Sequence, residues 1–75
     1  MKYISKQHTH YKNQIKDCVK YFLRNEGNWI EFNNDYNTIQ IISYLINLKI
    51  LNYTNSNIAK VNSFNANLYL NSKGK

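Results

Sequence analysis

Residues Asp35 to Lys49, DYNTIQIISYLINLK, decide how this chain folds. Isoleucine and leucine recur along this stretch at helical spacing, which predicts one amphipathic helix. Either Asn34 or Asp35 can cap its start through a side-chain oxygen. The residues expected on its core face are Ile39, Ile41, Ile42, Leu45, Ile46 and Leu48. The chain is therefore expected to fold around a helix whose other face is polar and uncharged.

That polar face consists of amide and hydroxyl side chains, with none that ionises near neutral pH. Its members are Tyr36, Asn37, Thr38, Gln40, Ser43 and Asn47. Amides and hydroxyls can form hydrogen bonds with base edges in the major groove of DNA. The same face could instead be a solvent-facing surface in an asparagine-rich chain. The sequence favours the DNA-reading interpretation.

A second amphipathic helix is predicted upstream, from about Thr9 or His10 to Asn25. Ser5 or Thr9 could cap its start, and Gly27 suits a left-handed residue beyond its end. Its apolar face is formed by Tyr11, Ile15, Cys18, Val19, Phe22 and Leu23. This face is expected to cover the central helix.

Beside that apolar face, cations recur at every fourth residue. They are Lys12, Lys16, Lys20 and Arg24. Steps of four advance about 40° round a helix, so the four side chains form one slanting ridge. Such a self-repelling ridge is suited to contact phosphates, although a solvated helix face in a lysine-rich protein is an equally good interpretation.

Composition restricts the class of protein. The 75 residues are enough for one domain, residues 1–75, with 1–8 and 72–75 expected to fray. Ten Lys and Arg against four Asp and Glu give a net charge of +6, which points to nucleic acid first and a membrane surface second. A single cysteine and the lack of an apolar leader or span predict a cytoplasmic protein.

No arrangement of residues predicts catalysis or a cofactor. Cys18 is expected to be a small core residue rather than a nucleophile, and His8 and His10 to be ordinary exposed histidines. With glycine only at 27 and 74, no phosphate-cradling glycine loop can form. The expected description is a non-enzyme with no metal and no cofactor.

The remaining segments predict short strands. Asn28–Phe32 reads as a strand in which Trp29 anchors the core. After the central helix, the strand candidates are 51–53, 58–61 and 68–70, with a preferred hairpin between 50–54 and 67–71. Asn62-Ser63 is expected to be a turn.

Three of these segments are similar to motifs of one known family. A short strand, Trp29–Phe32, precedes a helix, and Leu45–Leu51 (LINLKIL) looks like a leucine, three residues, a glycine and two apolar residues entering a wing. Leu68–Gly74 (LYLNSKG) is similar to a last wing strand that runs on to Lys-Gly. In this order and spacing, residues 28–74 resemble the winged helix–turn–helix family of DNA-binding domains, in the small form of phages, plasmids and other mobile elements.

The resemblance implies an α+β fold: a small winged-helix-like domain with a long N-terminal helix, a short strand, a central recognition helix and a C-terminal β-hairpin wing. Two departures affect the docking mode. Lys49 stands where the family usually has glycine, so the helix must end with another geometry or a strained residue. Only residues 33–35 separate the strand from the helix, so the family's additional helix has no room.

The implied function is sequence-preferring binding of double-stranded DNA by a small regulator or accessory factor. The six polar residues of the central helix would read bases, and Lys12, Lys16, Lys20, Arg24 and Lys60 would contact phosphates, with Lys60 in the wing. So small a domain would need a homodimer for a useful site. The second hypothesis is a protein-binding inhibitor or antagonist of a phage or mobile element, with anchors Tyr3, Tyr21, Tyr36, Tyr53 and Phe64.

Overall fold

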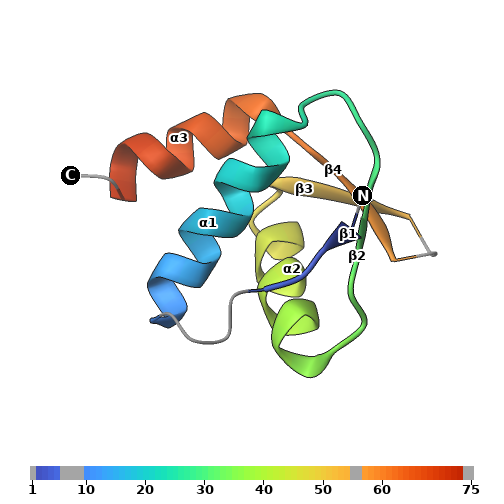
Figure 1. Cartoon of the computed structure of the whole chain (residues 1–75). Helices are drawn as coiled ribbons and strands as arrows, with labels where there is room; N and C mark the ends of the chain where they lie inside the picture. The colour runs from blue at the N-terminus through green and yellow to red at the C-terminus, as the bar shows by residue number, and fades with distance from the viewer. Residues whose placement is uncertain (1, 6–9, 55–56, 74–75) are drawn as a thin grey trace.

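The computed structural model describes residues 2–5, 10–54 and 57–73, which form three helices and a four-stranded mixed sheet (Figure 1). The first four elements along the chain are β1 (Lys2–Tyr3), α1 (Tyr11–Arg24), β2 (Ile30–Phe32) and α2 (Tyr36–Asn47). They are followed by β3 (Leu51–Thr54), β4 (Ile58–Val61) and α3 (Ser63–Lys73). The fold is therefore α+β, as the sequence predicts. No described helix combines the length and the hydropathy that crossing a bilayer requires.

The sheet has the strand order β1-β2-β4-β3. β1 pairs with β2 in parallel, and β4 pairs antiparallel with both β2 and β3. Side chains alternate across it, so Ile30 and Phe32 are buried while Glu31 between them is exposed. The three helices lie on one face of the sheet, and the other face is left uncovered (Figure 1).

The core lies between the helices and the covered face of the sheet. α2 contributes three of its least exposed side chains, Ile41, Ile42 and Leu45, each at most 1% exposed. α1 contributes mainly Val19 and Phe22 from the face predicted for it. The other buried hydrophobic residues are Tyr3, Ile15, Cys18, Ile30, Phe32, Ile50, Leu51, Ala59, Val61 and Ala66.

The resemblance left two possibilities for the end of α2, another geometry or a strained residue, and the structure has the strained residue. Lys49 has φ 66°, a left-handed conformation that costs a residue with a Cβ about 1–2 kcal/mol. The Ile50 N–H donates to the Leu45 carbonyl at 2.9 Å, and the Lys49 N–H donates to the Ile46 carbonyl at 3.0 Å. These two bonds form a Schellman motif, which directs the chain from α2 into β3. Gly27, φ 88°, is likewise left-handed as expected.

The hairpin prediction was wrong in its pairing. Residues 51–54 pair with 58–61, and 68–70 are helical rather than extended. Asn62 and Ser63 do not form a turn, because Asn62 caps α3: its side chain accepts a hydrogen bond from the Asn65 N–H at 3.1 Å. Phe64 and Leu68 recur four residues apart, a spacing that is also helical, but the β-favouring Leu68-Tyr69-Leu70 obscured it.

Other expectations about the ends and caps also need correction. The segment expected to fray at the N-terminus includes β1, and helix α3 continues through Ser72 and Lys73. His10, not Ser5, is the N-cap residue of α1, and it makes no side-chain capping bond. Thr9, the other capping candidate, lies outside the described residues. Trp29 is 49% exposed rather than a core anchor, and Leu48 is 41% exposed.

Candidate nucleic-acid interface

Four of the six residues predicted to read bases form one exposed strip along α2. They are Tyr36, Gln40, Ser43 and Asn47. They recur at intervals of three and four residues, so they lie on one side of the helix, opposite Ile41, Ile42 and Leu45. Tyr36, at 81% exposed, is the most accessible of the exposed large hydrophobic side chains. The strip offers hydroxyl and amide groups to a partner without any charge.

Thr38 does not belong to this strip, so its expected contact with bases is wrong. It is 0% exposed, and its hydroxyl lies 2.6 Å from an Asp35 carboxylate oxygen and 3.0 Å from the Ser5 hydroxyl. A hydroxyl has one proton, and the charged carboxylate at 2.6 Å is the stronger acceptor. The Ser5 N–H donates to the same Thr38 oxygen at 3.1 Å. Thr38 thus fastens the segment after β1 to the start of α2.

Asn37 belongs to the same polar network rather than to the exposed strip. Its side-chain amide donates to the Ser5 hydroxyl at 2.6 Å and to the Gln14 side-chain oxygen at 2.7 Å. Both amide protons are therefore used inside the protein, and the residue is half-buried. The network joins β1, α1 and α2, and it leaves Asn37 no free donor for an adenine edge.

Asp35 caps α2 as the sequence predicts. Its carboxylate accepts the Thr38 N–H at 3.1 Å, which is the capping bond of the first turn. Hydrogen bonds from the Thr38 hydroxyl, from the Asn33 amide and from this N–H stabilise the charged form and lower the pKa of Asp35 to about 2. The start of α2 is therefore held by a carboxylate that stays ionised over the physiological range.

The cationic ridge of α1 is divided between two surfaces. Lys12 and Lys16 line a cavity that also includes Tyr44 of α2 and Tyr69 of α3. Lys20 and Arg24 line a different cavity together with residues of β1. The ridge is divided because it slants round the helix. Twelve residues separate Lys12 from Arg24, and over that distance the ridge turns about 120° round the helix axis. Only the first half of the ridge borders α2.

Tyr44 connects the first half of the ridge with the polar strip. It is 39% exposed and follows Gln40 by one helical turn, on the side of α2 that faces α1. Tyr44 is not among the residues that the sequence predicted to contact DNA. Its position four residues after Gln40 is the sequence signal that could have added Tyr44 to the predicted contacts.

The hairpin borders the opposite side of the strip. Ser43 lines a shallow cavity with Tyr53 of β3 and Asn57, which has φ 56° at the end of the turn. Lys60 is half-buried on the uncovered face of the sheet, where its ammonium lies 5.4 Å from the centre of the Trp29 ring. Lys60 therefore does not stand at the hairpin tip, and residues 55–56 of the tip lie outside the described residues.

The described residues contain no group of three His, Cys, Asp or Glu side chains that could hold a metal ion. Cys18 is fully buried, and burial raises the pKa of its thiol to about 12, so it is a core residue and a poor nucleophile. His10 is exposed at the start of α1, whereas His8 lies outside the described residues.

Two of the five aromatic anchors proposed for a protein-binding surface are unsuitable. Tyr3 is 5% exposed, and Tyr21 is half-buried with its ring centre 5.2 Å from that of Tyr3. Tyr36, Tyr53 and Phe64 are exposed, and Phe64 reaches 73%.

A scan against protein-family models, a search of curated proteins and a search of solved structures found no match to this chain.

Proposed function

We propose that this protein binds double-stranded DNA with a sequence preference and places the exposed strip of α2 in the major groove. The observation that carries the proposal is the flanking of this strip on both sides. Toward α1, Tyr44 follows Gln40 by one turn and lines a cavity together with Lys12 and Lys16. Toward the hairpin, Ser43 lines a cavity with Tyr53 and Asn57. A helix in the major groove needs contacts of this kind to the two phosphate backbones beside it.

The order of elements supports a winged-helix-like mode of docking. From α1 to β4 the chain runs helix, strand, helix, hairpin, and the strand β2 pairs with the second strand of the hairpin, β4. In this proposal α2 is the recognition helix and the β3–β4 hairpin is the wing. No described helix lies between β2 and α2, where the family has its additional helix, and in this proposal α1 takes over its contact with α2.

The reading residues in this proposal are Tyr36, Gln40, Ser43 and Asn47. Gln40 and Asn47 can each form two hydrogen bonds with an adenine, worth about 1–3 kcal/mol of discrimination for each pair. A helix of 12 residues contacts few base pairs, so two copies on adjacent half-sites would be required for a long recognition sequence.

The number of phosphates contacted gives the sharpest test. If Lys12 and Lys16 each neutralise one phosphate, the slope of log Kobs against log salt is about −2 for each bound copy. If all four cations of the ridge took part, the slope would be about −4. Lys12→Met and Lys16→Met should each make the slope shallower by about one, whereas the matched variant Lys20→Met should leave it unchanged. Fluorescence anisotropy with labelled duplex at several salt concentrations measures these slopes.

The reading residues are tested separately. A selection from random duplexes identifies the preferred sequence, and Gln40→Ala should then reduce the preference by about tenfold while binding to unrelated DNA changes little. The matched variant Ser72→Ala, exposed at the end of α3, should not alter the preference. A selection that enriches no sequence at low salt would contradict the proposal.

A second candidate function is a protein-binding module, and one observation favours it. Phe64 and Leu68 are 73% and 53% exposed, one turn apart on α3, and Leu68 lines a cavity with Leu48 at the end of α2. Exposed apolar side chains that gather in this way are typical of interaction sites. Phe64→Ser should leave DNA affinity unchanged if the two functions use separate surfaces, and the protein should not bind duplex DNA at all if this candidate is the only function.

A further inference from the structure

Helix α3 exposes apolar side chains on the side that faces away from the core. Phe64 and Leu68 are 73% and 53% exposed, and they lie one turn apart on the helix. Ala66, on the opposite side of the helix, is fully buried, and α3 lies next to α1 (Figure 1). A helix that is apolar on two sides is typical of one covered on both of them. The fold covers only the side of Ala66, so the other side is available to a partner.

An apolar hollow of about 370 Å³ adjoins the exposed side of α3. Leu68 lines it together with Leu48 and Ile50, which lie between the last turn of α2 and β3. Phe64 is one turn before Leu68, and most of its ring contacts only water in the monomer. The chain therefore carries a projecting phenyl ring and an apolar hollow close together on one surface.

This surface lacks charge, although the chain as a whole is strongly basic. Residues 62–72, NSFNANLYLNS, include no side chain that is ionised at neutral pH, whereas the chain has a net charge of +6. Lys49 follows Leu48 in the sequence but does not line the hollow. A nucleic acid or an anionic membrane would require cations here, and a strongly charged protein would require opposite charges. The partner that fits is therefore another uncharged, apolar surface.

Exposed amides on the same side of α3 are suited to a copy of this surface. Asn67 and Asn71 follow Phe64 by three and seven residues, so they lie on its side of the helix. An amide has both donors and an acceptor, so it can pair with the same amide of a second molecule, which two ammonium groups cannot do. Two copies of a basic chain repel each other, and this repulsion is least where neither copy has charges at the contact.

We propose that this side of α3 binds a second copy of the chain about a twofold axis, with Phe64 of each copy in the hollow of the other. The two contacts form together, because ring and hollow lie close together on one surface, and such a pairing is closed at two copies. The inference rests on the second candidate function, for which it names the partner. It uses none of the reading residues of α2, and it would supply the two copies that a long DNA recognition sequence requires.

The size of the surface sets the expected affinity. α3 has 11 residues and is about 16 Å long. A contact between two such helices is near or below the roughly 1,200 Å² of total buried area that marks a stable interface. The dimer should therefore be weak, with a dissociation constant on the order of 10–100 μM. Because no ion pair crosses the contact and the copies repel each other, salt should strengthen the dimer by screening that repulsion.

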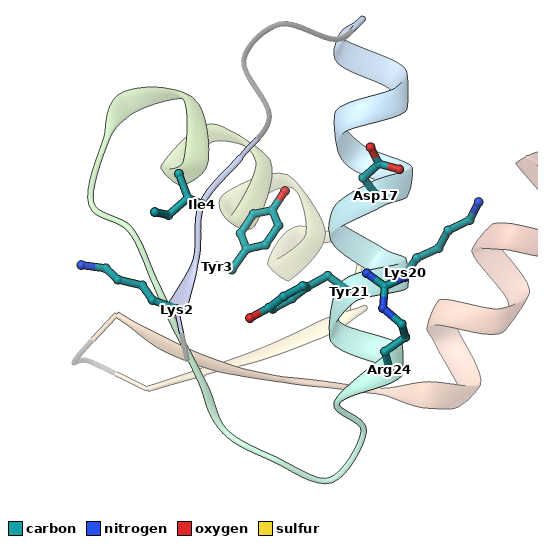
Figure 2. Close-up of a pocket in the computed structure, with 7 residues that line it drawn as sticks. All are labelled: Lys2, Tyr3, Ile4, Asp17, Lys20, Tyr21 and Arg24. Carbon is teal, nitrogen blue, oxygen red and sulfur yellow. The ribbon is translucent and has the colours of Figure 1, made fainter.

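Sedimentation equilibrium of the full chain without DNA tests the proposal, over roughly 5–500 μM so that the expected dissociation constant is bracketed. Leu68→Ser should weaken the dimer by at least about tenfold, because a twofold axis removes each side chain twice. Ile4→Ser is the matched control. Ile4 is 57% exposed, and α1 lies between it and α3 (Figure 2), so this variant should change the dissociation constant by less than about twofold.

Phe64→Ser provides a second variant that should fold normally. Its ring is mostly exposed, so the melting temperature of the dilute monomer should not fall, whereas the dimer should again weaken by at least about tenfold.

Three results would overturn the proposal: a chain that stays monomeric at every concentration, assemblies that grow beyond two copies, or a dimer that Phe64→Ser and Leu68→Ser leave intact. A monomer that captures a different protein through Phe64 would keep the second candidate function and still make the second copy the wrong partner. Because no DNA is present, failure of the DNA-binding proposal does not affect this measurement.

Discussion

The helices α2 and α3 are fixed in the fold to different degrees. α2 buries Ile41, Ile42 and Leu45 almost completely and is held at both ends, by the Asp35 cap and by the Schellman motif. Among residues 63–72 of α3 one side chain, Ala66, is fully buried, and Phe64 and Leu68 are exposed. The difference indicates that α2 can present a rigid surface, as groove reading requires, while the apolar surface of α3 is available to a partner.

The largest expected effect is on the free energy of unfolding, and it tests the difference in core packing between the two helices. Leu45→Ala should lower the free energy of unfolding by about 3 to 4 kcal/mol, because it leaves a cavity beneath α2. The matched variant Leu70→Ala in α3 should cost only about 1 kcal/mol, since Leu70 is half-buried. Urea denaturation followed by circular dichroism measures both values. Equal losses would show that α3 is as firmly packed as α2.

The polar network at the start of α2 gives the next largest effect. Thr38→Val keeps the side-chain volume but removes the hydroxyl that binds Asp35 and accepts the Ser5 N–H. We expect a loss of about 2 kcal/mol in the free energy of unfolding, mostly from the buried groups left without partners. Ser43→Ala on the exposed strip of the same helix should change stability by less than about 0.5 kcal/mol. A neutral Thr38→Val would mean that the network does not hold α2.

Acid should loosen the start of α2 before it affects α3. The pKa of Asp35 is about 2 in the folded protein and lies near 4 in an unfolded chain. Because the folded pKa is the lower one, the contribution of this carboxylate to stability is complete above about pH 4 and is lost as the pH falls toward 2. Asp35→Asn should therefore flatten the acid limb of a plot of melting temperature against pH. An unchanged limb would contradict the role of Asp35.

The smallest predicted effect is a gain in stability at the other end of α2. Lys49→Gly should raise the free energy of unfolding by about 1 kcal/mol, because glycine adopts φ 66° without steric cost. The side-chain amide of Asn65 donates to the Lys49 carbonyl at 2.9 Å, and this bond is kept in the variant. Thermal unfolding measures the gain. A loss of stability would mean that the Lys49 side chain makes a favourable contact of its own.

Local patterns in the sequence were sufficient to predict the elements that fix α2. Helical spacing predicted α1 and α2, and the short oxygen-bearing side chain of Asp35 marked the cap. Both signals depend on neighbours within about four residues in the chain, which is why sequence reasoning could find them. The unusual end of α2 at Lys49 was instead implied by the resemblance, which left open whether the end has another geometry or a strained residue.

The errors arose where distant residues decide the outcome. Thr38 and Asn37 looked like surface residues because Ser5, their partner, is more than thirty positions away in the sequence. β1 has two residues, too few for any periodicity, and only its pairing with β2 makes it a strand. The division of the cationic ridge likewise follows from what packs on each side of α1. Contacts that are distant in sequence therefore determined which of the polar residues remain available to a partner.

Trp29 is the single tryptophan of the chain, and it lies half-exposed beneath the ammonium of Lys60 on the uncovered side of the sheet. Its intrinsic fluorescence will therefore report on the environment of β4 rather than on the hydrophobic core. Unfolding should shift its emission maximum only slightly, since the indole already contacts water in the native protein. Any ligand that draws Lys60 away should nevertheless alter its emission intensity, which makes this residue a built-in optical probe of the hairpin.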